Sequence, residues 1–260
     1  MKPRASTSKR GVFRLADRVY HPRQEPRPGH ASLDTRRIAR PSTALPATLI
    51  ALNKPYGVIC QFSRDGDRRT LADFIEQPDV YPAGRLDTDS EGLLLLTNQG
   101  ALQHWISSPI AKSARNAAAV RPGGAAGNHF AGSVSGHRQA LLKTYWVQVE
   151  GEPDAAAIER LRAPLDLGDF VTAASAVRRI PEPAHLWPRD PPIRYRAAIP
   201  TSWMEVMVGE GKNRQVRRMT AAVGHPTLRL IRAAIGPVRV DDLPLGAWRN
   251  VTLAEIGYSR

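Results

Sequence analysis

Residues 84–98 read GRLDTDSEGLLLLTN, in which three acidic residues, Asp87, Asp89 and Glu91, stand two positions apart directly before four leucines. The leucine run indicates a buried strand, so the acids belong to a loop at its entrance. Three interpretations fit these residues: a metal-binding loop, a solvated turn, or a catalytic carboxylate. The remaining sequence has to distinguish between them.

Composition narrows the class of protein. The chain has 260 residues and 42% hydrophobic content, enough for one large domain or two small subdomains with a buried core. Its apolar runs are far shorter than the ~18 residues that span a membrane, so we expect no membrane association. Cys60 is the single cysteine, which excludes an internal disulfide and favours a reducing, cytoplasmic location. A formal net charge of +13 favours a polyanionic partner.

The positive charge is concentrated at the N-terminus. Residues 1–46 contain 11 Lys or Arg and 3 acids, so they carry +8 of the +13. They lack apolar periodicity, which predicts a disordered basic tail. An electrostatic arm, a solubility tail and a transit peptide are all compatible with this composition. Residues 113–139, rich in Gly and Ala and without an acid, predict a flexible insertion.

Residue patterns predict an α+β protein with more strand than helix. Apolar runs and alternation predict strands at 48–52, 58–62, 81–86, 93–97, 143–150, 203–208, 227–235 and 251–256. Helices are predicted at 70–75, 101–107, 153–162 and about 214–223, with Asn98 and Asn213 as candidate caps. In the last helix one face is apolar (Val216, Met219, Thr220, Val223) and the other basic (Arg214, Arg217, Arg218).

Motif chemistry weighs against a metal. A calcium loop beginning at Asp87 would need a bidentate Glu at its twelfth position, where Asn98 stands. The histidines lack metal-ligand spacing, no G-x-S-x-G elbow occurs, and the Gly-x-Gly-Lys at 209–212 is too short for a phosphate loop. In an extended segment Arg85 and Asp87 project to the same side. Spacing alone leaves a surface ion pair and a catalytic carboxylate equally open.

Four motifs in the same order resemble the RsuA-type pseudouridine synthases. They are LNKPYGV (52–58), GRLDTDSEGLLLLTN (84–98), KTYWVQVEG (143–151) and GEGKNRQVRRM (209–219). LWPRDPPIRYRAAIPTSW (186–203) and GHPTLRLIRAAIG (224–236) resemble the branch that acts on large-subunit rRNA. The resemblance spans roughly 48–253. The basic tail and the insertion have no counterpart in it, and we expect no S4 RNA-binding module.

The resemblance implies a pseudouridine synthase fold over 47–257, with a mixed, mainly antiparallel sheet in two subdomains, flanking helices and a catalytic cleft between them. It implies isomerisation of a flipped uridine in ribosomal RNA, namely the large-subunit 23S RNA, by a monomer without cofactor or metal. A non-catalytic rRNA-binding factor and a synthase for tRNA or small-subunit RNA are the alternatives.

The resemblance also assigns roles to single residues. Asp87 matches the essential aspartate, Tyr145 the tyrosine that stacks on the base, and Lys212 the cation that pairs with the aspartate. Asp89 and Glu91 are expected to shape the loop. The candidate RNA-binding residues are Arg85, which fills the gap left by the base or contacts phosphate, Arg214, Arg217 and Arg218 as phosphate contacts, Leu230 in the uracil pocket, and Asn53 and Lys54.

Overall fold

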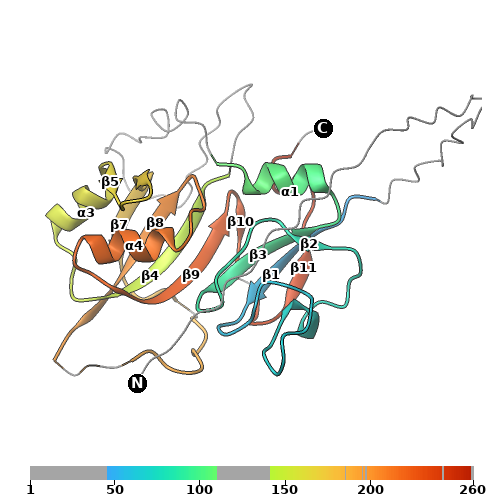
Figure 1. Ribbon diagram of the computed structural model, residues 1–260, viewed down its shortest axis with the longest axis horizontal. Helices are drawn as coiled ribbons and strands as arrows, with labels where there is room; N and C mark the ends of the chain where they lie inside the picture. Colours follow the sequence, from blue (N-terminus) through green and yellow to red (C-terminus); the bar gives the residue numbers. More distant parts are fainter. Residues whose placement is uncertain are drawn as a thin grey trace, which may run out of the picture. The chain divides into compact units, whose positions relative to one another are not determined.

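The computed structural model describes residues 46–109, 141–184, 186–194, 196, 198–241 and 243–258, within one compact unit, Leu45–Arg260 (Figure 1). The predicted tail lies outside the described residues except for its last position. The predicted insertion at 113–139 lies wholly outside them.

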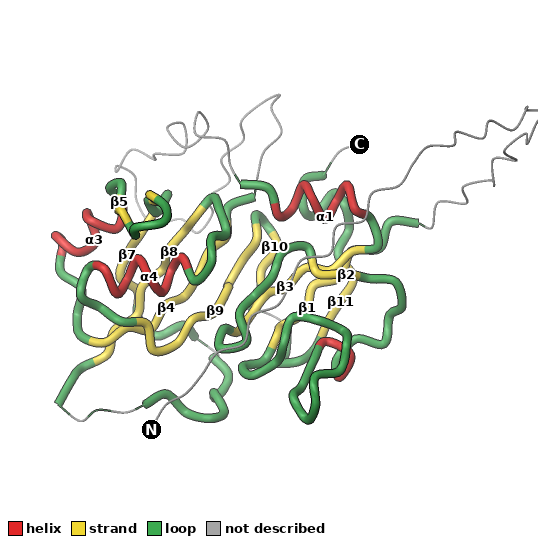
Figure 2. The backbone as a smooth tube through the Cα atoms, viewed as in Figure 1, coloured by secondary structure: helices red, strands yellow, loops and turns green. Residues whose placement is uncertain are grey.

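Strands dominate the described chain, as predicted (Figure 2). The strands are β1 (Leu49–Lys54), β2 (Tyr81–Pro82), β3 (Glu91–Thr97), β4 (Lys143–Glu150), β5 (Leu165–Asp166), β6 (Val171–Thr172), β7 (Ala176–Ile180), β8 (Thr201–Val208), β9 (Thr227–Ile235), β10 (Val238–Arg239) and β11 (Trp248–Asn250). The helices are the 3-10 turn η1 (Leu71–Asp73), α1 (Gly100–Ser107), α3 (Ala155–Arg162) and α4 (Gln215–Ala222).

One large sheet has the order β11-β1-β3-β9-β4-β8-β7, with β2 also on β3 and β10 also on β9 (Figure 1). Its neighbouring strands are antiparallel except β3 and β9, which run parallel over Glu91↔Ile231 and Gly92↔Arg232. This confirms the predicted α+β class with a mixed, mainly antiparallel sheet. The short parallel contact joins one half of the sheet, β11-β1-β3, to the other, β9-β4-β8-β7.

Gly92 is required at this parallel contact. Its φ is +98°, and a Cβ built there would lie 2.5 Å from the backbone oxygen of Arg232. Any side chain would therefore push β3 and β9 apart, while glycine also adopts the positive φ without strain. The Gly after Glu91 in the opening sequence thus fixes how closely the two halves approach.

Two apolar clusters occupy the two faces of the sheet. Along β4, Tyr145, Val147 and Val149 belong to the first cluster and Trp146 to the second, as alternation predicted. Helices α3 and α4 pack into the first cluster and α1 into the second. The predicted stripe of α4 is confirmed, because all four of its residues are buried.

Some local predictions were wrong. Residues 58–62 form no strand: Ile59 makes an isolated bridge to Thr70, and the Val58 oxygen accepts a hydrogen bond from Lys54. Of the predicted strand at 81–86, only Tyr81–Pro82 forms a strand, followed by one further backbone hydrogen bond from Ala83 N to Leu95 O. The last strand is Trp248–Asn250 rather than 251–256, because β1 pairs with the polar segment before the apolar one.

Both predicted asparagine caps were also wrong. The Asn98 side chain accepts from Thr48 N at 2.9 Å, which ties the start of β1 to the end of β3, and α1 is capped at Gln99. Helix α4 is preceded by Arg214 at its N-cap, in the left-handed region with φ 47°. From this position the Arg214 side chain reaches the acidic loop, where it pairs with Asp89.

Candidate active site

The loop between β2 and β3, residues 85–90, is held by hydrogen bonds that its backbone oxygens accept from three other segments. The bonds run from Arg232 Nη1 to Arg85 O at 3.3 Å, from Gly57 N to Thr88 O at 2.8 Å, and from Arg217 Nη2 to Asp89 O at 2.6 Å. The donors come from β9, from the turn after β1 and from α4. The loop is therefore fixed where the two halves of the sheet meet.

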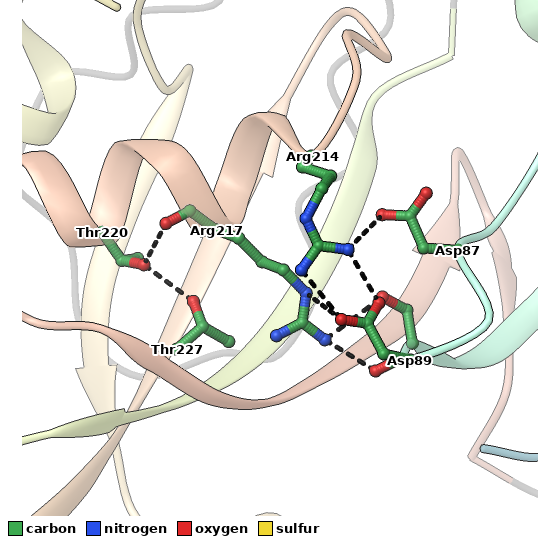
Figure 3. A network of polar contacts seen from close by, with 7 residues as sticks. Asp87, Asp89, Arg214, Arg217, Thr220 and Thr227 are labelled. Carbon is green, nitrogen blue, oxygen red and sulfur yellow. Dashed lines mark hydrogen bonds and ion pairs between the residues drawn. The ribbon is translucent and has the colours of Figure 1, made fainter. Parts of the chain in front are cut away.

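Arg214 connects the two aspartates of this loop (Figure 3). Its Nη2 lies 2.8 Å from Asp89 Oδ2, and its Nη1 lies 3.8 Å from Asp87 Oδ2. Arg217 adds an ion pair of 3.5 Å to Asp89. The Asp87 side chain is 42% exposed, so this carboxylate is the one that can meet a substrate, while Asp89 is occupied by two arginines.

The charges of this network are strongly coupled. Burial by itself raises the pKa of the Asp89 carboxyl, but the hydrogen bond from Arg214 and the charges of Arg217 and Arg214 hold that pKa below its usual value. Burial lowers the pKa of Arg217, opposed by the charge of Asp89. Asp89 therefore stays ionised and keeps both arginines in place beside Asp87.

Helix α4 and the turn before it have their own anchors. Thr220 Oγ1 lies 2.7 Å from Thr227 Oγ1 and joins α4 to β9 (Figure 3). At the first residue of α4, Gln215 Oε1 accepts from Lys212 N, and Gln215 Nε2 donates to Thr172 Oγ1 at 2.6 Å. These contacts fix the place from which the arginines of α4 reach the loop.

The predicted pairing of Lys212 with Asp87 is not found. Lys212 Nζ lies 5.6 Å from the centre of the Phe170 ring, and the cation that lies beside Asp87 is Arg214. Arg218, predicted to contact phosphate, donates to Leu167 O and pairs with Asp169. The turn before α4 points Lys212 toward the 167–170 segment, which sequence spacing did not reveal.

Asn53 and Lys54, predicted to contact RNA, lie inside the fold at 0% exposure. Asn53 Nδ2 donates to Leu243 O, and Lys54 Nζ donates to the oxygens of Pro55 and Val58. Burial lowers the pKa of Lys54 to about 8. Asn53 and Lys54 support the turn whose Gly57 N bonds to the acidic loop. They are therefore too deeply buried in this structure to contact RNA directly.

Tyr145 and Leu230 come together with Leu86, the residue before Asp87, in the first apolar cluster. Tyr145 on β4 is 8% exposed and pairs across the strands with Arg232, while Leu230 on β9 is 5% exposed. Arg85 is exposed. The structure thus buries both residues in the apolar cluster next to Leu86, and their contact with a base remains a prediction.

Glu91 does not shape the loop as expected. Its carboxylate forms a bidentate pair with Arg229, both bonds at 2.8 Å, and accepts from Trp187 Nε1 at 2.8 Å. Sequence reasoning missed Arg229, Arg232 and Trp187. Two arginines inside the apolar strand TLRLIRAAI (227–235) were the available signal, because a buried Arg needs a specific partner.

Within the described ranges, no three His, Cys, Asp or Glu side chains are grouped so as to hold a metal ion. None of the described helices combines the length and apolar character needed to cross a membrane.

Comparisons with known proteins identify the family of this chain. Residues 48–116 match the RNA pseudouridylate synthase family. The chain is 45% identical over 205 residues to ribosomal large subunit pseudouridine synthase E of Vibrio vulnificus (strain CMCP6), covering 79% of this chain and 75% of that protein. It is 49% identical over 197 residues to the protein of the same name from Xanthomonas axonopodis pv. citri (strain 306), covering 75% and 89%.

A solved structure described as a pseudouridylate synthase superposes with a TM-score of 0.55 at 24% identity, covering 81% of this chain and 72% of that one. This likeness supports the fold.

Proposed function

Because this chain belongs to the RNA pseudouridylate synthase family, we propose that it converts a specific uridine of large-subunit ribosomal RNA to pseudouridine, with Asp87 as the essential carboxylate. The observation that carries the assignment of Asp87 is its position. It projects from a loop fixed on three sides, is partly exposed, and has a cation 3.8 Å away.

The proposed reaction is an isomerisation, so no atoms or electrons have to be supplied. The C1′–N1 bond breaks, the uracil turns, C5 bonds to C1′, and the proton lost from C5 is balanced by one gained at N1. The sugar becomes electron-poor as the base departs, and a fixed carboxylate stabilises that centre. Tyr145 and Leu230 supply an aromatic and an apolar surface for a base that has left its helix.

Arg214 is proposed as the cation that orients Asp87. It bridges Asp87 and Asp89, so its removal frees one carboxylate to turn and leaves the other with a single arginine. Lys212 remains the second candidate, because it lies two residues earlier in the same turn. Arg214→Met and Lys212→Met, compared for turnover and RNA affinity in parallel, separate the two. We expect the larger loss of turnover from Arg214→Met.

RNA is proposed to reach the loop from the side of Arg85, whose exposed side chain contacts phosphate or fills the place of the flipped base. Residues 1–46 are proposed to add a non-specific electrostatic arm, with the protein in the cytoplasm. If about 5 of the arm's cations contact phosphates, deleting it flattens the slope of log affinity against log salt by ~3.5–4.5. An unchanged slope after deletion would show that residues 1–46 make no phosphate contacts.

The direct test of the function is Asp87→Asn, which removes the charge and keeps the shape. Release of tritium from C5-labelled uridine in rRNA should be lost, while RNA affinity and thermal stability stay near those of the unchanged protein. Asp79→Asn, at an exposed position before β2 that the proposed mechanism does not use, is the matched control and should keep full activity.

Three outcomes are informative. Activity retained in Asp87→Asn would overturn the role of Asp87. Activity of the unchanged protein only on tRNA or small-subunit RNA would overturn the substrate. RNA binding without any tritium release would favour a non-catalytic binding factor.

A further inference from the structure

Two buried cationic side chains on the Tyr145 face of the sheet have a nitrogen with no hydrogen-bond partner among the described residues. They are Lys143, 6% exposed, with its Nζ unpartnered, and Arg232, 4% exposed, with its Nη2 unpartnered. Buried polar atoms are nearly always hydrogen-bonded, and a buried charge without a partner is costly. Two such atoms on neighbouring strands therefore need an explanation.

Their placement is set by the strands. On β4, Lys143 pairs with Val208 of β8 and Tyr145 with Val206, and both valines belong to the first apolar cluster. The two side chains therefore share a face, roughly 7 Å apart along the strand. Arg232 pairs directly with Tyr145, and its other nitrogens donate to Leu93 O and Arg85 O. The pair thus lies beneath the surface proposed for the base and beside the start of the Asp87 loop.

Charge compensation is incomplete here. Burial lowers the pKa of Lys143 to about 8, helped by the like charge of Arg232 and opposed by Glu210 after β8. Those are the charged groups that affect Lys143 from β9 and β8. Glu210 Oε1 already accepts from Thr172 Oγ1 and Gln215 Nε2. Among the described residues, Glu210 is thus the one carboxylate that offsets the burial of Lys143, while Arg232 adds a like charge.

We propose that Lys143 and Arg232 form an electropositive floor that stabilises the uracil anion while it is detached from the ribose. The inference rests on the proposed function. When the C1′–N1 bond breaks, its electron pair moves onto the uracil ring and delocalises over N1, O2 and O4. The base must then turn to present C5, and a buried charge acts through its field at every orientation, which a fixed hydrogen bond does not.

Lys143→Met separates this role from a structural one. A charge at about 7 Å and an effective dielectric near 20 changes the rate roughly 10–50-fold, so turnover at saturating rRNA should fall by that factor. RNA affinity should change less than about twofold, because Lys143 is not a surface contact. Thermal stability should stay level or rise, because an uncompensated buried charge becomes an apolar side chain.

The pH profile gives a second readout. In the unchanged protein kcat/KM should fall as the pH rises through about 8, because Lys143 then loses its proton. Lys143→Arg, which stays charged, should keep most of the turnover and lose this descending limb. Lys143→Gln, polar but uncharged, should match Lys143→Met. Arg239→Met, which removes a surface cation paired with Asp241, is the control and should change none of these quantities.

The outcomes are distinguishable from failure of the proposed function. If the unchanged protein is active and both Lys143→Met and Lys143→Gln keep full turnover, only this inference falls. If turnover and thermal stability fall together in both variants, Lys143 is structural and the inference is wrong. If the unchanged protein shows no activity on any rRNA, the proposed function falls and the inference with it.

Discussion

The two faces of the sheet at the β3–β9 contact use arginine in opposite ways. On one face Arg229 forms a bidentate pair with Glu91, which also accepts a hydrogen bond from Trp187, so both of these charges have partners. On the other face, three residues further along β9, Arg232 binds two backbone oxygens, keeps one nitrogen unpartnered and lies near the unpartnered Lys143. The Glu91–Arg229 pair stabilises the fold, whereas Lys143 and Arg232 are proposed to stabilise a negatively charged substrate group.

The difference teaches how a buried charge can be interpreted. A closed pair such as Glu91–Arg229 contributes little net stability against an apolar pair, but removing one partner is costly. Buried cations without enough counter-charge, such as Lys143 and Arg232, lower the stability of the free protein. We infer that they are retained because a bound anion supplies the missing charge. The following changes test that distinction, from the largest expected effect to the smallest.

Glu91→Gln should have the largest effect. It leaves Arg229 buried, at 8% side-chain exposure, without a counter-charge, and should lower the free energy of unfolding by about 3–5 kcal/mol. Urea unfolding measures the change. Glu205→Gln breaks a pair whose arginine, Arg178, is 67% exposed, and should cost only about 0–1 kcal/mol. Equal losses in the two variants would remove the contrast between the faces.

Gly92→Ala should follow, because it forces apart the contact on which both faces depend. The added Cβ meets the Arg232 backbone at 2.5 Å and takes on an unfavourable positive φ. We expect a loss of about 2–4 kcal/mol in the free energy of unfolding, with turnover falling as the loop shifts. Gly168→Ala, at a positive φ with open space around it, isolates the backbone strain. A loss no larger than that of the control would mean that the strands separate easily.

The pH dependence of stability should distinguish the buried cations without enough counter-charge. The folded pKa of Lys143, about 8, lies below its unfolded value of roughly 10.4. Between these values the unfolded chain holds a proton that the folded chain has released, so stability rises with pH. Relative to Lys143→Met, the unchanged protein should gain on the order of 2 kcal/mol from about pH 7 to about pH 10. A constant difference between them would show that Lys143 is neutral or compensated.

Trp187→Phe should have the smallest effect. It removes one donor to Glu91 Oε1, which still receives Arg229 Nη2, so the loss should be about 0.5–1.5 kcal/mol. Differential scanning calorimetry should show a melting temperature lowered by a few degrees, roughly 2–4 °C for each kcal/mol, while turnover stays unchanged. A large loss of turnover at unchanged stability would show that the face with Glu91 and Arg229 takes part in catalysis.

The sequence by itself determined the fold class and the strands with a strong pattern. Residues 143–150 and 227–235 were predicted with the bounds that the structure shows, because alternation or a long apolar run leaves one way to bury them. The buried stripe of α4 followed from its spacing for the same reason. Segments such as 58–62 and 251–256 failed, because a short apolar run is buried as well by a turn as by a strand, and pairing partners decide which.

For the candidate site too, some residues followed from the sequence, whereas their contacts followed only from the tertiary structure. Motif order predicted that Asp87, Tyr145 and the basic turn before α4 belong to one site, but spacing could not choose the cation beside Asp87. Arg214 reaches Asp89 across 125 positions of sequence, and the left-handed conformation of Arg214 directs it there. Only the tertiary structure decided this contact, and with it the burial of Asn53 and Lys54 and the unpartnered Lys143. Charge in a sequence is a count, whereas its compensation depends on which strands and loops pack together.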